Sequence, residues 1–319
     1  MSIRLTRQSV LYQTSSGPEI VGILGDRATT FSPPRWAGTS APSGDPSVTA
    51  VVGHGLDAAH WVEARQSRSD LRVRTPAGQS ALSTPTLSGC PAAVAWTGGT
   101  EVAWTQDSGV WTSRQVGAAF GMPVLVSGDM SPGFPSLATD GKGRTWCAWR
   151  VQDSAGRYWI RLAERASGSA PWVRWDTAIQ GMDPSLVYSA GFLWLGYHLG
   201  WDCRVTCGAA NSSAWAPTAK PRRPEAALDA QGHFVGLAAG GGRVVAAWSR
   251  WDEVGDDKRD DLRHAGMATL SLPATGIAVS GRTVTQAGNQ IYPGPYATER
   301  GCGVVWVDGA AGVIQRAGL

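Results

Sequence analysis

The sequence lacks the features that mark membrane, secreted or nucleic-acid-binding proteins. It has no apolar stretch of about 18 residues, which excludes a membrane-spanning helix. The segment Met1 to Gln8 has no apolar core of the kind found in a secretory signal, so we expect no export by that route. The net charge is only +3 and no basic run occurs, so nucleic acid is not an expected partner.

Cysteine and histidine are also scarce, which narrows the chemistry. Five cysteines are present, and Cys203 and Cys207 lie on one expected strand. Four residues of extended strand span roughly 13 Å, too far for a disulfide, so we expect free thiols and no zinc site. The five histidines show no metal-ligand or catalytic-triad spacing. The run Gly240–Gly242 lacks the Lys and Ser or Thr of a phosphate-binding loop.

Glycine, proline and tryptophan are abundant. The chain has 41 Gly and 19 Pro, which indicates frequent turns. It has 16 Trp against 5 Phe and 6 Tyr, so the largest flat side chain dominates the aromatic content. Only three of the 28 basic residues are lysine, and arginine stacks well on tryptophan.

Residues 134–149 predict a β-hairpin. A short run, Pro135 to Ala138, precedes the turn Asp140 to Gly143, and an aromatic-rich run follows from Arg144. Two further runs at 158–163 and 172–175 are separated by turn residues. Four short antiparallel strands within about 45 residues are typical of one blade of a β-propeller.

The same unit recurs along the chain. Each copy has a strand of small residues, often led by proline, then a turn and a second strand that ends in an aromatic residue. These anchor residues follow one another at intervals of 43 to 58 positions and are Trp61, Trp104, Trp149, Tyr197, Trp248 and Trp306. We expect each ring to fill the wedge between neighbouring sheets, burying about 150–250 Å².

The spacing predicts an all-β fold, a single β-propeller over residues 1–319. Six four-stranded blades within 46–319 are favoured, and seven blades are the alternative. The last unit stops after its third strand, so residues 1–12, with Ile3 to Tyr12 as the strand, are expected to supply the missing outer strand and close the ring. Residues 13–45 are then a long loop or a degenerate blade built on Glu19 to Leu24.

The pattern Pro-Ser-Leu-Ala-x-Asp-x-x-Gly followed by an apolar run ending in Ala-Trp resembles the repeats of sialidase-like β-propellers, the bacterial neuraminidase repeat. The resemblance covers about residues 46–319. The family's Asp-box, Ser/Thr-x-Asp-x-Gly-x-Thr-Trp, has a near counterpart at Thr139 to Trp146, with one residue too many between Asp140 and Gly143. It also falls in the first hairpin of the unit, whereas the family's box follows the third strand. The resemblance therefore implies the architecture and not the activity.

The turn after each anchor predicts a binding face. In propellers these turns surround the entrance of the central channel, and here each carries a polar or acidic residue. An aromatic ring beside such a group suits a sugar, because the ring stacks on apolar C–H faces while the polar group binds hydroxyls. Packing of the same rings between blades is the alternative. The candidate ligand-binding residues are Arg150, Asp153, Trp201, Asp202, Arg250, Trp251 and Asp252.

Residues 251–261 form the most charge-dense loop, with six carboxylates in eleven positions. Four of them are weak candidates for a Ca²⁺ site, although their spacing does not match the EF-hand pattern, and a solvated loop is the alternative. These residues are Asp252, Asp256, Asp257 and Asp260. No other cofactor is implied, and no catalytic residue is assigned.

Two functions stay open. The favoured one is a non-enzymatic binding or assembly propeller, a phage virion or tail-associated protein that recognises a surface or glycan or docks neighbouring virion proteins. A rigid, Trp-rich all-β body without a secretion signal is typical of proteins released by lysis or within a particle, and the cytoplasm is the other location. The alternative is a sialidase-like glycoside hydrolase, in which carboxylates and arginines would converge on an axial pocket.

Overall fold

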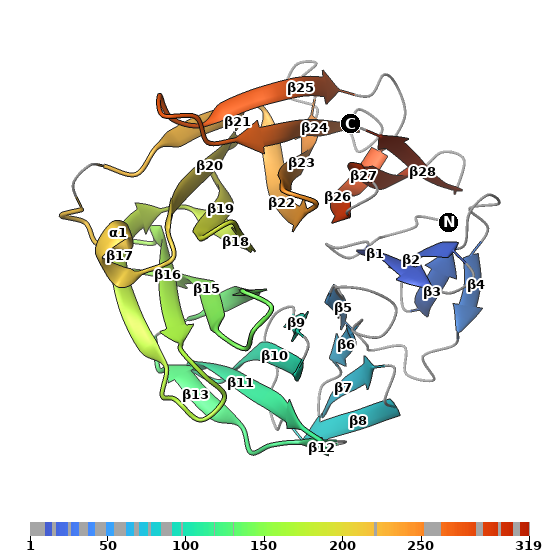
Figure 1. Cartoon of the computed structure of the whole chain (residues 1–319), viewed down its shortest axis with the longest axis vertical. Coiled ribbons are helices and arrows are strands. Elements are labelled where there is room, and N and C mark those ends of the chain that lie inside the picture. The colour runs from blue at the N-terminus through green and yellow to red at the C-terminus, as the bar shows by residue number, and fades with distance from the viewer. Residues whose placement is uncertain are drawn as a thin grey trace.

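The protein consists almost entirely of β-strands arranged in a ring (Figure 1). The computed structural model describes the backbone except for residues 1–9, 15–16, 25–26, 32–37, 42–48, 54–61, 67–69, 76–77, 84–90, 97, 118, 130, 220–221, 252–262, 285–289, 299–300, 309–312 and 319. Side chains are described for most of residues 91–250 and 264–282 and for a few positions elsewhere. The described residues contain no helix long enough to cross a membrane.

The first thirteen strands form three antiparallel sheets, which follow one another along the chain. The first sheet contains β1 (Val10–Thr14), β2 (Gly17–Leu24), β3 (Arg27–Phe31) and β4 (Gly38–Ala41). The second contains β5 (Thr49–Gly53), β6 (Val62–Gln66), β7 (Asp70–Thr75) and β8 (Gly78–Ser83). The third contains β9 (Ala92–Trp96), β10 (Gly99–Gln106), β11 (Gly109–Val116), β12 (Ala119–Phe120) and β13 (Val124–Ser127).

Four more sheets complete the described strands. The fourth contains β14 (Gly133–Thr139), β15 (Thr145–Gln152), β16 (Tyr158–Arg165) and β17 (Val173–Gln180). The fifth contains β18 (Met182–Ser189), β19 (Phe192–Leu199), β20 (Asp202–Ala209) and β21 (Glu225–Asp229), with helix α1 (Ser212–Trp215) before β21. The sixth contains β22 (Gly232–Gly240), β23 (Arg243–Trp251), β24 (Arg263–Ser271) and β25 (Ala278–Val284). The seventh contains β26 (Gln290–Thr298), β27 (Gly301–Asp308) and β28 (Val313–Gly318).

This arrangement confirms the all-β propeller. The first strand of each sheet faces the centre of the ring, and consecutive first strands such as β14, β18 and β22 contact one another (Figure 1). The predicted hairpin at 134–149 is β14 and β15. Its turn is held by Asp140, whose Oδ1 accepts from the backbone N–H groups of Lys142 at 2.8 Å and Arg144 at 3.2 Å, while Gly141 takes φ +77°.

The anchor aromatics pack between sheets as predicted. Trp104, Trp149 and Trp248 are fully buried and Tyr197 is 3% exposed. Each ring joins a cluster with side chains of the preceding sheet, such as Leu71 on β7 for Trp104. Trp61 and the side chain of Trp306 lie outside the described residues. A large apolar ring removed from water at each junction is the main attraction between neighbouring sheets.

Two of the anchors also form a charged hydrogen bond across the junction. Trp149 Nε1 donates to Asp129 Oδ2 at 2.9 Å, and Trp248 Nε1 donates to Asp229 Oδ2 at 2.8 Å. Both carboxylates lie where the chain leaves one sheet for the next. Across β24, the ring of Trp248 lies over Gly266, where a Cβ would come within 2.2 Å of it. The anchor position therefore fixes residues on both sides of the junction.

A serine in each of two first strands links it to the next sheet. Ser136 Oγ accepts from Leu186 N at 2.9 Å, and Ser185 Oγ accepts from Leu237 N at 2.9 Å. All four residues lie near the centre of the ring, where strands are closest. A small hydroxyl side chain fits there and satisfies a backbone donor that the sheet itself leaves unpaired.

A buried ion cluster joins the third and fourth sheets. Glu101, which is fully buried, accepts from Arg114 Nε at 3.0 Å and pairs with Arg165 of β16. Arg114 also donates to Thr145 Oγ1 at 2.7 Å. Burial lowers the pKa of both Arg114 and Arg165 to about 10, so both stay charged at neutral pH and the carboxylate is satisfied from two sheets.

The cysteines with described side chains behave as expected. Cys147, Cys203, Cys207 and Cys302 are free and buried. Burial raises the pKa of the Cys207 thiol to about 12, so it is inert at neutral pH. Cys90 lies outside the described residues.

The number of described sheets differs from the favoured blade count, and only part of the predicted closing strand is described. The described strands form seven sheets, which matches the alternative of seven blades and not the favoured six. Residues 13–45 contain β2, β3 and β4 and so form a sheet instead of a long loop. Val10 to Tyr12, part of the predicted closing strand, lie in β1 and pair with β2, and residues 1–9 lie outside the described part. Runs of only four to eight residues suffice for strands once neighbours pack against them, so a segment rich in Gly, Ser and Pro can still hold a sheet.

Replacing Trp248 by Phe should cost more stability than replacing Trp104 by Phe. Both rings are fully buried, so the loss of volume is the same. Trp248 donates to the buried Asp229, whereas Trp104 Nε1 reaches Gln106 Oε1 at a longer 3.3 Å. We expect W248F to lower the free energy of unfolding by about 1–3 kcal/mol more than W104F, measured by urea denaturation. Equal losses would show that the indole–carboxylate bond does not stabilise the junction.

Candidate functional site

The first strands of four neighbouring sheets share a bulge near their start. In β14, β18, β22 and β26 the pairing with the second strand shifts at the same point. Three of the bulged residues, Phe134, Asp183 and Phe234, have φ values of 52°, 50° and 53°, a region that side chains other than glycine disfavour. Each such residue costs of order 1–3 kcal/mol, so a strained bulge repeated in three of these sheets marks this end of the ring as a candidate site.

Arg150 links two of these bulges. Its guanidinium lies 4.1 Å from the ring centroid of Phe134 and 4.8 Å from that of Tyr158. Its Nη1 is 3.1 Å from Oδ1 of Asp183 in the next sheet. The arginine is therefore held between an aromatic face on one sheet and a carboxylate on its neighbour, which fixes the orientation of both.

Asp183 also contacts a buried histidine. Its Oδ2 is 3.1 Å from His198 Nε2, and His198 Nδ1 is 2.9 Å from the carbonyl oxygen of Gly200. Asp183 and His198 are 9% and 2% exposed. Both ring nitrogens face oxygen atoms, so the histidine ring is held in one orientation between Asp183 and Gly200.

Aromatic rings continue this group toward the sixth sheet. The His198 ring centroid is 4.8 Å from that of His233 and 5.9 Å from that of Phe234. The half-buried Trp201, in the turn between β19 and β20, meets His233 edge to face at 4.0 Å. We call the whole group the bulge cluster, with members Phe134, Arg150, Asp183, His198, Trp201, His233 and Phe234.

The structure divides the predicted site residues into three groups. Arg150 and Trp201 belong to the bulge cluster. Arg250 lies beside the neighbouring bulge, where Nη2 donates to Gln231 Oε1 at 3.1 Å and Nη1 is 3.6 Å from Asp229 Oδ2. The other two described residues, Asp153 and Asp202, have local partners instead. The side chain of Trp251 and residues Asp252, Asp256, Asp257 and Asp260 lie outside the described part of the chain.

Asp202 and Asp153 serve their own hairpins. Asp202 Oδ2 accepts from Arg204 Nε at 2.7 Å, two residues further along the same strand, β20. Asp153 accepts from the backbone N–H groups of Ala155 and Arg157, and from the indole of Trp159, each at 2.9 Å. Within the described residues, no group of three or more His, Cys, Asp or Glu is placed to hold a metal ion. The Ca²⁺ prediction for the 252–260 loop stays a prediction.

Sequence reasoning missed Phe134, Asp183, His198, His233 and Phe234. The signal for the bulged residues was present, since Phe134 and Asp183 each stand directly before a Pro-Ser pair. Proline favours an extended conformation in the residue before it, so the Pro-Ser pair marks a recurring position but does not predict the positive φ of Phe134 and Asp183. His198 follows the anchor Tyr197 directly, as Arg150 follows Trp149. The residue after each anchor was therefore the position to inspect.

No family model matches the sequence, and no curated protein matches it. Similar solved structures include the Cps50 (Swd1) β-propeller domain of Myceliophteria thermophila, which is 8% identical over 99% of each chain with a TM-score of 0.63. Trypanosoma rangeli sialidase is 10% identical over 98% of this chain and 57% of its own, with a TM-score of 0.49. A GH43_1 enzyme from Xanthomonas citri is 14% identical over 72% of this chain and 87% of its own, with a TM-score of 0.42.

These comparisons show the fold alone. The likeness to the Cps50 domain extends over the whole chain and agrees with the ring of antiparallel sheets. The sialidase and the GH43_1 enzyme have TM-scores below 0.5 and carry no argument about this chain. The function therefore has to be argued from the residues of this chain.

Changing Asp183 to Asn tests the centre of the bulge cluster. Asn keeps the size of Asp and tolerates positive φ, but it leaves Arg150 and His198 without a carboxylate. We expect the free energy of unfolding to fall by about 1–3 kcal/mol. The matched control is D202N, whose half-buried pair with Arg204 lies at the surface and should contribute at most about 1 kcal/mol. Urea denaturation measures both, and an equal effect would contradict a buried ionic centre.

The pH dependence of the Asp153 turn gives a second test. The hydrogen bond from Trp159, followed by that from the Arg157 backbone, lowers the pKa of Asp153 to about 2. A lowered pKa stabilises the fold above the unfolded value of about 3.9, and this contribution disappears as the pH falls from about 4 to about 2. The indole N–H resonance of Trp159 should therefore shift with a midpoint near pH 2. It should not titrate in D153N, and a midpoint near 4 would contradict the assignment.

Proposed function

We propose that this chain is a non-enzymatic binding propeller that recognises a glycan, a surface or a neighbouring subunit through the face carrying the bulge cluster. The half-buried ring of Trp201 lies next to His233, and the ion pair of Arg150 with Asp183 is in the same cluster. A ring beside fixed polar groups is the chemistry by which proteins hold sugars and polar protein surfaces. The rigid network keeps the ordering cost of binding low.

One observation carries the choice of binding over hydrolysis. The four carboxylates Asp129, Asp153, Asp183 and Asp229 at the turns and strand starts already serve the fold. Asp183 lies between Arg150 and His198, Asp229 accepts from Trp248, and Asp129 accepts from Trp149 and pairs with Arg174 at 3.0 Å. A glycosidase needs two carboxyl groups about 5–10 Å apart that face the substrate. A carboxylate engaged in this way is a poor acid, base or nucleophile.

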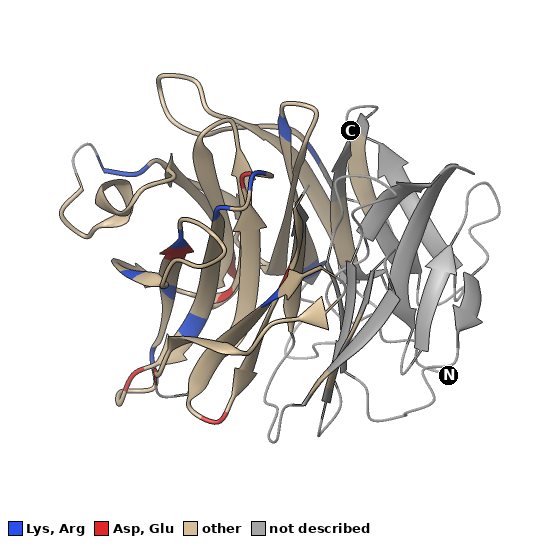
Figure 2. Cartoon of the chain, turned by 60° about the horizontal axis from the view of Figure 1, so that its bottom comes forward, with Lys and Arg blue, Asp and Glu red and all other residues tan. Residues whose placement is uncertain are grey.

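The proposal includes the setting of the protein. An Arg- and Trp-rich ring with close junctions between its described sheets suits a particle component, so we place it on a phage virion or tail, or free after lysis. Such a component needs contacts spread over one face more than a deep pocket. In Figure 2, basic and acidic positions are scattered over the described strands and turns.

Glycan recognition is tested by an array experiment combined with a single substitution. We expect the wild-type chain to bind a subset of glycans and W201A to lose at least about tenfold in affinity, because the stacking surface is removed. The matched control is F192A, which removes a 37% exposed ring at the opposite end of β19. The same samples are assayed against a panel of fluorogenic glycosides.

The outcomes separate the possible roles. Array binding that depends on Trp201 supports glycan recognition. If no glycan on the array binds the chain, and the chain is present in stoichiometric amounts in purified virions, the result supports subunit docking. Turnover of any glycoside would falsify the non-enzymatic proposal, and an equal loss in W201A and F192A would remove the bulge-cluster face from it.

A further inference from the structure

A cavity lies between the fourth and fifth sheets, away from the bulge cluster. It has a volume of about 640 Å³, within the range of small-molecule sites. Its walls come from β17, β19 and β20 and from the segment between α1 and β21. Tyr197 and Leu199 line it, whereas His198 between them joins the bulge cluster. Successive residues of a strand point to opposite faces, so the two sites lie on opposite sides of one sheet.

The side chains that line this cavity carry more positive than negative charge. Arg204, Arg222 and Arg223 line it together with a single carboxylate, Glu225. Both carboxylate oxygens of Glu225 have a partner. Oε1 accepts from Arg204 Nη1 at 2.6 Å, and Oε2 accepts from the hydroxyl of Tyr197 at 2.6 Å. Burial and this bond to Glu225 raise the pKa of Tyr197, so the phenol stays protonated as a donor. Arg204 is neutralised in turn by Glu225 and Asp202.

Arg223 contributes a cation whose hydrogen-bond partners, among the described residues, are all carbonyl oxygens. It donates to the backbone oxygens of Ala214 at 3.2 Å, Ala216 at 3.4 Å and Thr177 at 3.4 Å, and it stacks on Trp215. Burial is the main cause that lowers its pKa, which reflects the cost of holding the charge there. An anion that enters the cavity would reduce that cost.

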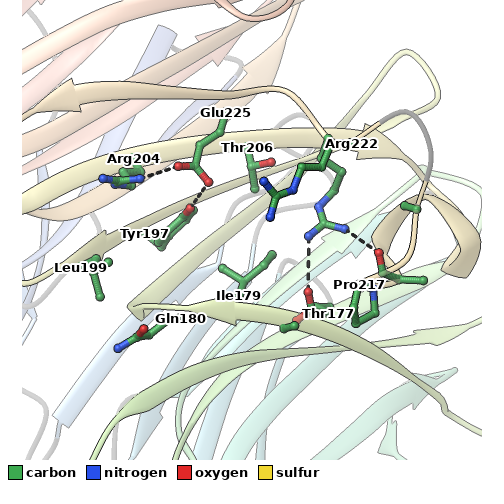
Figure 3. A pocket seen from close by; sticks show the side chains of 14 residues that line it. Thr177, Ile179, Gln180, Tyr197, Leu199, Arg204, Thr206, Pro217, Arg222 and Glu225 are labelled. Carbon is green, nitrogen blue, oxygen red and sulfur yellow. Dashed lines mark hydrogen bonds and ion pairs between the residues drawn. The ribbon is translucent and has the colours of Figure 1, made fainter.

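Arg222 and Gln180 supply the groups that can hold a ligand. Figure 3 shows their side chains on opposite sides of the view, both without a dashed line. Within the part of the chain that the structure describes, neither side chain has a hydrogen bond or ion pair. Arg222 is exposed and presents a planar donor fork, the geometry that matches a carboxylate.

The rest of the lining is apolar and shaped by a strained residue. Ile179, Leu199 and Pro217 form aliphatic walls. Ala178 in β17 has φ 50°, at an irregularity in the pairing of β16 with β17. Strain of this kind persists where the surroundings hold it, and here it shapes the wall of the cavity.

From these contacts we infer that the cavity binds a small organic carboxylate with a compact aliphatic body. Arg222 pairs with the carboxylate, the charge of Arg223 supports it from behind, and Ile179 with Leu199 covers the aliphatic part. Glu225 in the same lining repels a second negative charge, so a monocarboxylate binds better than a phosphate dianion. This inference does not depend on the proposed function of the opposite face.

The test uses N-acetyl-leucine and its neutral amide as a matched pair of probes in calorimetric titrations of the full chain. We expect the acid to bind at least about tenfold more tightly than N-acetyl-leucinamide, because only the acid pairs with Arg222. R222Q should reduce the affinity for the acid by about tenfold, to the level of the amide. The control K142Q removes the same charge from an exposed turn of the fourth sheet and should leave binding unchanged.

Each remaining outcome overturns the inference. Equal binding of acid and amide would exclude carboxylate recognition. Binding of the acid that is unaffected by R222Q would place the ligand elsewhere. Inorganic phosphate that displaces the acid at equal concentration would indicate a general anion site, and no binding of the acid at about 10 mM would leave no site of useful affinity. Arg222 has no partner among the described residues, so its substitution tests binding without disturbing a known contact of the fold.

Discussion

The described junctions of the propeller depend on one large ring from the second strand of a sheet, which packs against the sheet before it. Trp104, Trp149, Tyr197 and Trp248 all do this, and the three tryptophans are completely removed from water. A sheet has few ways to cover its flat face, and a ring of this size both covers it and sets the spacing to the next sheet. In two of these contacts, the indole also donates a hydrogen bond to a carboxylate at the connection between sheets. This bond fixes the orientation of the ring in addition to its burial.

The bulge cluster is a geometric consequence of that packing. Because side chains alternate along a strand, an anchor that points to the preceding sheet forces the next residue to point to the following one. Arg150 follows Trp149 and meets Asp183 of the fifth sheet, and His198 follows Tyr197 and meets the rings of the sixth. The bulges bring Asp183 and the two phenylalanines into reach at the same end of the ring. In these two repeats the packing residue and the bulge-cluster residue are therefore neighbours in the sequence.

Because side chains alternate along β19, the bulge cluster and the cavity lie on opposite faces of its sheet. On one side, fixed ion pairs and aromatic edges form a closed network in which carboxylates are already satisfied, which favours recognition over catalysis. On the other side, two arginines without a carboxylate partner among the described residues border a cavity with aliphatic walls. A charge that the fold itself does not neutralise favours an external anion. One rigid sheet thus separates a surface suited to a large partner from a cavity suited to a small one.

The sequence by itself determined the all-β class, the repeat, the hairpin at 134–149 and the burial of the anchor aromatics, because periodicity and turn residues act locally. Only the tertiary structure decided that residues 13–45 hold a sheet, that Asp153 and Asp202 serve their own hairpins, and that Asp183 contacts both Arg150 and His198. Those outcomes depend on contacts between positions far apart in the chain or on competition among nearby partners. A carboxylate beside an aromatic residue looks the same in sequence whether it binds a ligand or its own turn, since only the packed neighbours decide which donor reaches it first.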